Sequence, residues 1–125
     1  MTDLDFLIRG YIDAVYFTEV DEDGLSNTPL AAISLRRIQR TCEGFYELYK
    51  DKLEEECGAS LDQVGHDLHL TRQGHGVGFW DRSDDFYPLH LRNEFTDYAR
   101  KLSHIDEFIF EEDIASRDFL KSSRN

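Results

Sequence analysis

Residues 65–82, GHDLHLTRQGHGVGFWDR, concentrate the side chains of this chain that could do chemistry. A histidine beside a carboxylate can exchange protons near neutral pH and so act as a general acid or base. Arginine and tryptophan are residue types that anchor binding interfaces. Seven residues are therefore candidates for a binding or reactive site: His66, Asp67, Arg72, His75, Trp80, Asp81 and Arg82.

The order of polar and apolar residues in this segment predicts a β-hairpin. Leu68 and Leu70 alternate with polar residues, and such alternation is typical of a half-buried strand. Residues 73–76, QGHG, contain glycines that permit a tight turn. Residues 77–82, VGFWDR, would then form the returning strand.

A metal site is not expected in this hairpin. His66 and His69 would point to opposite faces of one strand, so they could not bind the same ion. His75 would lie in the turn, a strand's length away from His66. We therefore predict neither a metal ion nor another cofactor.

Two interpretations of the polar residues stay open. In the first, the segment does no chemistry: its aspartates and arginines form cross-strand ion pairs while Phe79 and Trp80 pack the hairpin, or else Trp80, His75 and the arginines present a binding face. In the second, the chain is a small enzyme or a small-ligand binder. The residues that would then have to converge in one pocket are His66, Asp67, Arg72 and Asp81. The first interpretation is favoured and no catalytic residue is assigned, because no nucleophile stands in an activating motif and no phosphate-binding loop is present.

A first helix is predicted for residues 2–17, where apolar residues recur at intervals of three and four. Thr2 and Asp5 form a capping box at its start. Gly10 lies inside this helix at a cost of about 1 kcal/mol relative to alanine, which indicates a close contact at that position.

Two further helices are predicted on either side of the polar segment. Residues 31–58 have helical spacing and end at Gly58, a natural helix stop. Residues 85–102 follow the segment, with Pro88 at the first helical position. Residues 60–63, SLDQ, form a short capping box that indicates a single helical turn.

The fold predicted from these elements is α+β. Residues 104–113, HIDEFIFEED, contain isoleucines and phenylalanines typical of a strand, which would join the hairpin in a three-stranded antiparallel sheet. The element order would be α-α-β-β-α-β, with the helices on one face of the sheet. Residues 1–118 would form a single domain, and residues 119–125 a frayed polar tail.

The net charge of the chain is −12, from 26 acidic and 14 basic residues. Such a charge repels nucleic acid and anionic membranes at long range, so neither is expected as a direct partner. It suits a basic protein partner, mimicry of a nucleic-acid backbone, or solubility alone. One local basic patch occurs near the start of the second predicted helix, at Arg36, Arg37 and Arg40.

The acidic residues form three clusters that could contact a basic partner. The first cluster does not match an EF-hand loop, because the twelfth position counted from Glu19 is Leu30 rather than glutamate. The clusters consist of Glu19, Asp21, Glu22 and Asp23, of Glu54, Glu55 and Glu56, and of Glu111, Glu112 and Asp113.

Cys42 and Cys57 are expected to be reduced. Both fall in the second predicted helix, and fifteen residues of helix separate them by ~22 Å, which is beyond disulfide reach. The N-terminal residues lack the pattern of a signal peptide, and no stretch reaches the ~20 apolar residues of a membrane helix. These features are typical of a cytosolic protein.

The polar segment resembles the motif GHDFWLTRNGHGAGFWDR, which recurs in a widespread family of small uncharacterised bacteriophage proteins. The similarity extends over nearly the whole chain. Residues 7–24, LIRGYIDAVYFTEVDEDG, are similar to the family's IEGYIECALWSSTDDEG, and the helix around Cys42 has Cys and Phe at the family's spacing. Residues 104–113 parallel the family's closing VDLYVGDDG.

The resemblance implies an early or accessory phage protein, without a settled activity. The family motif has an aromatic residue where this chain has His69, and an asparagine where it has Gln73. His69 is therefore not expected to be a required ligand. The glycine-rich end of the family's closing strand is replaced here by FEEDIAS, residues 110–116.

We therefore expect a phage-encoded acidic accessory protein in the cytoplasm of the infected bacterial host. It would bind and modulate a host protein, in host takeover or anti-defence. A basic nucleic-acid-binding or defence protein is the expected target, because the acidic clusters could present a phosphate-like field to it. A homodimer formed through the sheet face is a further alternative.

Overall fold

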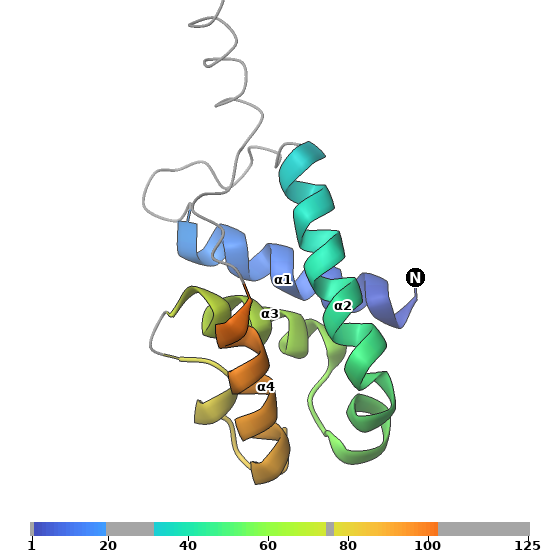
Figure 1. The fold of residues 1–125 in the computed structure, drawn as a ribbon, viewed down its shortest axis with the longest axis vertical. Coiled ribbons are helices and arrows are strands. Elements are labelled where there is room, and N and C mark those ends of the chain that lie inside the picture. Colours follow the sequence, from blue (N-terminus) through green and yellow to red (C-terminus); the bar gives the residue numbers. More distant parts are fainter. Residues whose placement is uncertain (1, 20–31, 75–76, 103–125) are drawn as a thin grey trace, which may run out of the picture.

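Four α-helices and one 3-10 turn make up the part of the chain that the computed structural model describes, which is residues 2–19, 32–74 and 77–102. The elements are α1 (Asp3–Glu19), α2 (Ala32–Glu56), α3 (Leu61–Gln73), the 3-10 turn η1 (Phe79–Asp81) and α4 (Leu89–Lys101). Figure 1 shows α1 and α3 running across the molecule, whereas α2 and α4 run along its long axis.

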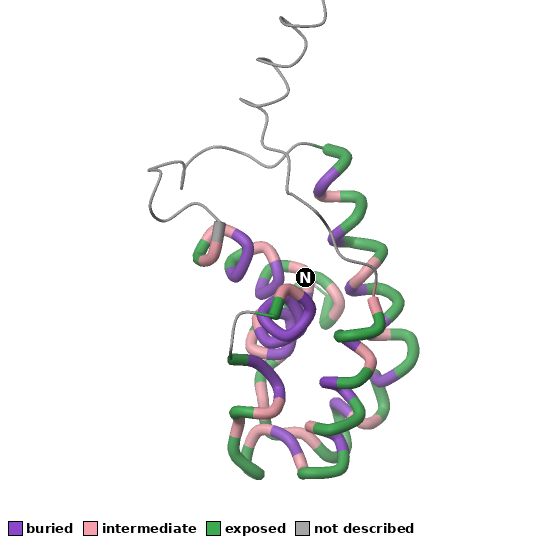
Figure 2. Tube along the Cα trace, turned by 60° about the vertical axis from the view of Figure 1, so that its left-hand side comes forward, coloured by how far each residue is buried: buried purple, intermediate pink, exposed green. Residues whose placement is uncertain are grey.

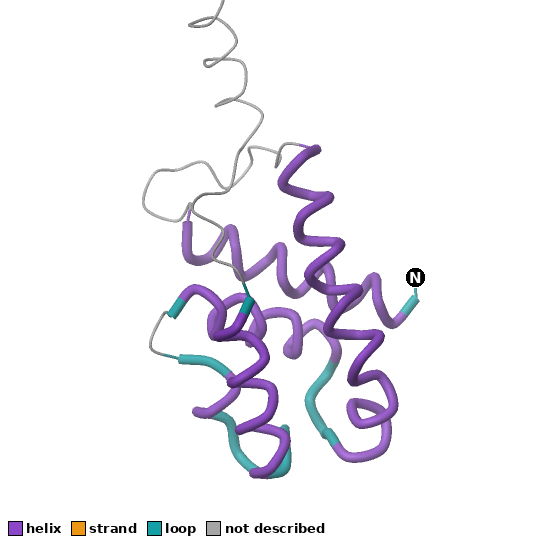
Figure 3. Tube along the Cα trace, viewed as in Figure 1, coloured by secondary structure: helices purple, strands orange, loops and turns teal. Residues whose placement is uncertain are grey.

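The predicted α+β fold is wrong. The described residues contain helices and loops and no strand (Figure 3). The first predicted strand of the hairpin lies in α3, and the second, residues 77–82, forms a loop and η1. The sheet face suggested as a homodimer interface is therefore absent from these residues. The predicted final strand, residues 104–113, and the predicted tail, residues 119–125, lie outside the described residues.

α3 has a recognisable cap at each end. The hydroxyl of Ser60 accepts a hydrogen bond from the N–H of Gln63 at 3.4 Å, as expected of an N-cap. Gly74 ends the helix with a φ of 71°, in the left-handed region that favours glycine, and its N–H donates to the last turn of the helix. The capping box at residues 60–63 therefore starts a helix of 13 residues rather than a single turn.

The strand-like alternation within α3 has a physical cause. α1, α4 and η1 all pack against this helix, and most of its residues are buried. A helix that is buried on nearly all sides has no polar face, so its hydrophobic pattern loses the period of 3.6 residues. The polar Asp67, His69 and Thr71 are accordingly buried beside Leu68 and Leu70.

Two glycines let α1 and α3 approach each other closely. A Cβ added at Gly65 of α3 would lie 1.9 Å from the carbonyl oxygen of Leu7. A Cβ added at Gly10 of α1 would lie 1.9 Å from the carbonyl oxygen of Asp62. Neither position accepts a side chain unless the helices move apart. The close contact predicted at Gly10 is confirmed, and the element that makes it is α3.

Aromatic rings fill the core where α2, η1 and α4 meet. The ring centroid of Phe45 lies 5.1 Å from that of Phe95 and 5.8 Å from that of Phe79. Tyr87 packs edge-on against Phe79 at 5.2 Å. All four rings are completely buried, and Figure 2 shows the buried positions on the sides of the helices that face one another.

The helices predicted around the polar segment are present as α2 and α4, but α2 ends at Glu56, and α4 begins only at Leu89, with Pro88 as its N-cap residue rather than its first helical residue. The capping box of α1 is present: the Thr2 N–H donates to Asp5 Oδ2 at 2.9 Å, and the Asp5 N–H donates to Thr2 Oγ1 at 3.2 Å.

Cys42 and Cys57 are both free. Among the described residues, none of the helices combines the length and the apolar character needed to span a membrane.

We expect Gly65→Ala to lower the free energy of unfolding by roughly 1–3 kcal/mol, because the new methyl group would overlap the Leu7 carbonyl. Gly44→Ala is the matched control on α2. Gly44 is exposed, with the Tyr98 hydroxyl 3.3 Å from an added Cβ, and alanine favours a helix by about 1 kcal/mol over glycine. Urea unfolding followed by circular dichroism measures both variants. Unchanged stability of Gly65→Ala would contradict the close α1–α3 contact.

Candidate functional site

A buried carboxylate lies at the centre of the polar segment. Asp67, on α3, is completely buried. Its Oδ1 accepts hydrogen bonds from Arg82 Nε at 3.0 Å, from Arg82 Nη2 at 2.7 Å and from Gln63 Nε2 at 3.0 Å. Its Oδ2 accepts one from the Tyr87 hydroxyl at 2.8 Å. Both oxygens are therefore satisfied by the protein itself.

These hydrogen bonds join α3 to the loop that leads into α4. Arg82 directly follows η1, and Tyr87 lies two residues before α4 begins. Arg92 of α4 donates from Nη1 to the carbonyl oxygen of Arg82 at 2.8 Å. The arginine that neutralises Asp67 is thus itself held in position by the next helix.

The ion pair shifts the pKa values of the groups around it. The hydrogen bond to Asp67 raises the pKa of the Arg82 guanidinium, so this side chain stays charged. Burial, reinforced by the negative charge of Asp67, raises the pKa of Tyr87 far above the usual range of tyrosine. Tyr87 therefore remains a neutral hydrogen-bond donor at physiological pH, and the arrangement stabilises a static network.

Arg72 also points into the protein rather than toward a ligand. Its side chain is buried at the C-terminal end of α3. Nη1 donates to the Thr41 hydroxyl on α2 at 2.8 Å and to the Tyr11 hydroxyl on α1 at 3.4 Å. Arg72 thereby connects three helices.

The neighbouring Thr71 positions the 3-10 turn. Its Oγ1 accepts a hydrogen bond from the N–H of Phe79 at 3.1 Å. A Cβ at Gly78 would lie 2.2 Å from this same oxygen, so the close approach requires glycine. The threonine and the glycine therefore bring Phe79 into the aromatic core.

His66 and His69 lie three residues apart on α3, not on opposite faces of a strand. His69 is completely buried, and its Nε2 lies 2.9 Å from Thr18 Oγ1 of α1. His66 is half-buried, with its ring centroid 6.0 Å from that of Phe17. His75 lies outside the described residues. Across residues 2–19, 32–74 and 77–102, no group of three or more His, Cys, Asp or Glu side chains could hold a metal ion.

Trp80 and Asp81 lie on the outer side of η1. Trp80 is half-buried, and the Cζ of Arg100 lies 5.1 Å from its ring centroid, within the range of a cation–π contact. Asp81 is exposed and forms no ion pair with another described residue. Both side chains remain accessible to a partner.

The structure does not bring His66, Asp67, Arg72 and Asp81 into one pocket. Asp67 is enclosed by its own partners, Arg72 lies against α1 and α2, and Asp81 faces solvent. The cross-strand ion pairs considered from the sequence do not form, since there is no hairpin. The pair that does form, between Asp67 and Arg82, connects a helix to a loop.

Sequence reasoning missed two partners of the buried carboxylate. Gln63 lies four residues before Asp67, a spacing that places both side chains on one face of a helix. That spacing would have been a signal if the segment had been predicted as a helix. Tyr87 lies 20 residues after Asp67 and has no local signal in the sequence.

Only one of the three predicted acidic clusters has its side chains within the described part of the chain. Glu54, Glu55 and Glu56 are exposed at the C-terminal end of α2. Glu56 Oε1 lies 3.2 Å from His90 Nε2 of α4. The side chain of Glu19 and the remaining predicted acidic positions, Asp21, Glu22, Asp23, Glu111, Glu112 and Asp113, lie outside the described part of the chain.

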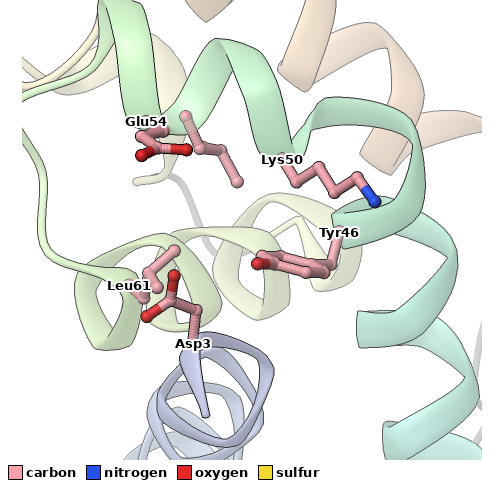
Figure 4. Close-up of a pocket in the computed structure, with 6 residues that line it drawn as sticks. Asp3, Tyr46, Lys50, Glu54 and Leu61 are labelled. Carbon is pink, nitrogen blue, oxygen red and sulfur yellow. The ribbon is translucent and has the colours of Figure 1, made fainter.

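A pocket of about 130 Å³ adjoins this acidic end of α2 (Figure 4). Asp3 and Glu54 contribute carboxylates to it, and the ammonium group of Lys50 points away from both of them in Figure 4. The pocket is lined by Asp3 of α1, by Tyr46, Lys50, Leu53 and Glu54 of α2, and by Leu61 of α3. These residues are distant in the chain, so the sequence contained no sign of the pocket.

A second, more open hollow of about 380 Å³ lies at the other end of α2. Its lining includes the three arginines of the basic patch recognised in the sequence, together with Ile33. α2 therefore has a basic hollow near its start and an acidic pocket near its end.

Comparison with known proteins identifies no relative of this chain. No protein-family model matches the chain, and neither curated proteins nor solved structures include a significant match.

We expect Asp67→Asn to lower the free energy of unfolding by roughly 2–4 kcal/mol, because it leaves Arg82 without its counter-charge. The side chain of Arg82 is 28% exposed, which keeps the loss below that of a fully buried pair. Asp81→Asn removes the same charge at an exposed position and should change stability by less than about 0.5 kcal/mol. Urea unfolding compares the two. Equal losses would show that Asp67 has no special structural role.

Stability is also expected to fall as the pH rises above the usual tyrosine pKa of 10.0. Burial raises the pKa of Tyr11 to about 12 and raises that of Tyr87 as well. Above pH 10 the unfolded chain loses these protons while the folded chain keeps them. The free energy of unfolding should then decrease by about 1.4 kcal/mol per pH unit for each tyrosine. Unfolding curves between pH 8 and pH 11 measure this slope, and Tyr87→Phe should make it shallower. An unchanged slope in that variant would show that the raised pKa of Tyr87 does not contribute to the pH dependence of stability.

Proposed function

We propose that this protein is a phage-encoded accessory protein that binds a basic protein of the bacterial host through its acidic surface. The observation that carries the proposal is the pocket beside the acidic end of α2. Its two carboxylates, from Asp3 and Glu54, have no ion-pair partner among the described residues. The phage origin and the host cytoplasm rest on the resemblance of the 65–82 motif.

The polar residues of the 65–82 segment are used inside the protein, so a binding site is better sought elsewhere on its surface. Asp67, Arg72 and Arg82 hold helices together through hydrogen bonds inside the protein. Asp67 and Arg72 are buried, and Arg82 directs its Nε and Nη2 at Asp67, so these groups are engaged inside the protein. No observation favours the alternative of a small enzyme or small-ligand binder in this segment.

The pocket has the chemistry to receive a lysine or arginine side chain from a partner. The aliphatic stem of such a side chain would lie along Leu53, Leu61 and the ring of Tyr46. Its charged end would reach the carboxylates of Asp3 and Glu54. Charge-assisted hydrogen bonds of this kind are about twice as strong as neutral ones. The pocket therefore favours a cationic partner residue over an apolar one.

The charge distribution along α2 supports the same partner chemistry. Exposed carboxylates at the C-terminal end of a helix oppose the macrodipole, each by up to ~1 kcal/mol. Their field attracts a basic surface and increases the rate of association. A host nucleic-acid-binding or defence protein has such a surface, so the acidic end of α2 would act there as a mimic of nucleic acid. The carboxylates concerned are those of Asp51, Glu54, Glu55 and Glu56.

Affinity capture from bacterial lysate at low and at high salt, followed by mass spectrometry, tests the proposal. We expect one stoichiometric basic protein that is retained at low salt and lost at high salt, because salt screens exposed charges. Asp3→Asn combined with Glu54→Gln should weaken binding of that protein by about tenfold, the factor given by ~1.4 kcal/mol for two exposed pairs.

Glu43→Gln combined with Glu47→Gln is the matched control. Both residues are exposed on α2, lie outside the pocket and carry the same total charge as Asp3 and Glu54. This control should retain the partner. Equal weakening in both double variants would attribute binding to net charge rather than to the pocket. Capture of no protein at either salt concentration would contradict the proposed function.

A further inference from the structure

The start of α2 has a basic surface although the protein is acidic. Ile33, Arg36, Arg37 and Arg40, here called the arginine face, line the open hollow of about 380 Å³. All four residues are exposed, and Ile33 leaves 43% of its surface in solvent. The first turns of α2 project beyond the other described helices in both Figure 1 and Figure 2.

The guanidinium groups of this face have no ion-pair partner among the described residues. No ion pair or hydrogen bond joins their side chains to a described carboxylate, whereas Arg82 and Arg92 each pair with an aspartate. An anionic group bound to the arginine face would neutralise these guanidinium groups.

We infer that the arginine face binds residues 104–113 of this same chain, HIDEFIFEED. This segment contains five carboxylates and no lysine or arginine. Arginine forms bidentate hydrogen bonds with carboxylates, which suits a face with three guanidinium groups. The apolar residues of the segment, Ile105, Phe108, Ile109 and Phe110, match the exposed Ile33 and the arginine stems.

The course of the chain allows this contact. In Figure 1 the C-terminal end of α4 points along the molecule toward the end at which α2 begins. The structure describes the chain as far as Leu102, and 23 residues follow it (103–125). A fully extended chain spans up to ~3.3–3.6 Å per residue, so residues 103–113 can extend up to ~36–40 Å beyond Leu102.

A tethered segment fits this face better than a free anion does. The net charge of −12 repels a free acidic peptide or a nucleic acid at long range. A segment of the same chain avoids this obstacle, because a short tether gives an effective concentration of about millimolar. The contact is a property of the chain alone and does not depend on the proposed host partner.

Photo-cross-linking in the full-length protein tests the inference. A photoreactive phenylalanine analogue replaces Phe108, and mass spectrometry identifies the residues to which it becomes linked. We expect links within one chain to residues 33–40. The double variant R36E/R40E should reduce their yield by about tenfold, because attraction becomes repulsion. This variant should retain its fold, since both substituted positions are exposed, and circular dichroism verifies this.

The control variant R9E/K50E reverses two charges at exposed positions outside the arginine face and should leave the yield unchanged. Links from position 108 to other parts of the protein, or equal losses in both double variants, would overturn the inference. A mixture of isotope-labelled and unlabelled protein separates links within a chain from links between copies. Predominance of links between copies would also overturn it.

Discussion

The carboxylate of Asp67 is the group on which the arrangement of the described helices depends. A charge removed from water costs several kcal/mol unless charged and polar partners surround it. Arg82 and Tyr87 supply those partners from the loop before α4, and Gln63 supplies one from α3. Satisfying this one carboxylate therefore fixes η1 and the start of α4 against α3. The same placement brings the rings of Phe79 and Tyr87 into the aromatic core.

The polar residues of this protein fall into two groups, one that holds the helices together inside and one that is exposed on α2. The charged residues of the 65–82 segment lie mostly inside, where they connect helices, and α2 presents opposite charges to solvent at its two ends. Its glutamates lie in the last turn, at the negative end of the helix macrodipole, and so oppose the dipole. Counter-charges from outside the described residues would stabilise both ends. The two proposals supply them, from a host protein at the acidic end and from residues 104–113 at the basic end.

The sequence identified important residues of the 65–82 segment, but it did not predict what those residues do. Asp67 and Arg82 stood out because they are charged residues in a segment rich in glycine and histidine, and they do interact. The sequence could not show that Asp67 is enclosed, because Tyr87 is distant in the chain and its contact depends on the fold. The pocket between Asp3, Glu54 and Leu61 escaped detection for the same reason, since three helices contribute to it.

The sequence by itself determined the elements that keep one face in water. α1, α2 and α4 have apolar stripes of helical period, because each packs on one side and is solvated on the other. Only the tertiary structure decided that the 65–82 segment begins as a helix. α3 is surrounded by α1, α4 and η1, so its residues alternate in polarity without facing water. Its buried polar groups are satisfied by partners from other elements, and local sequence cannot reveal partners that only the folded chain brings near.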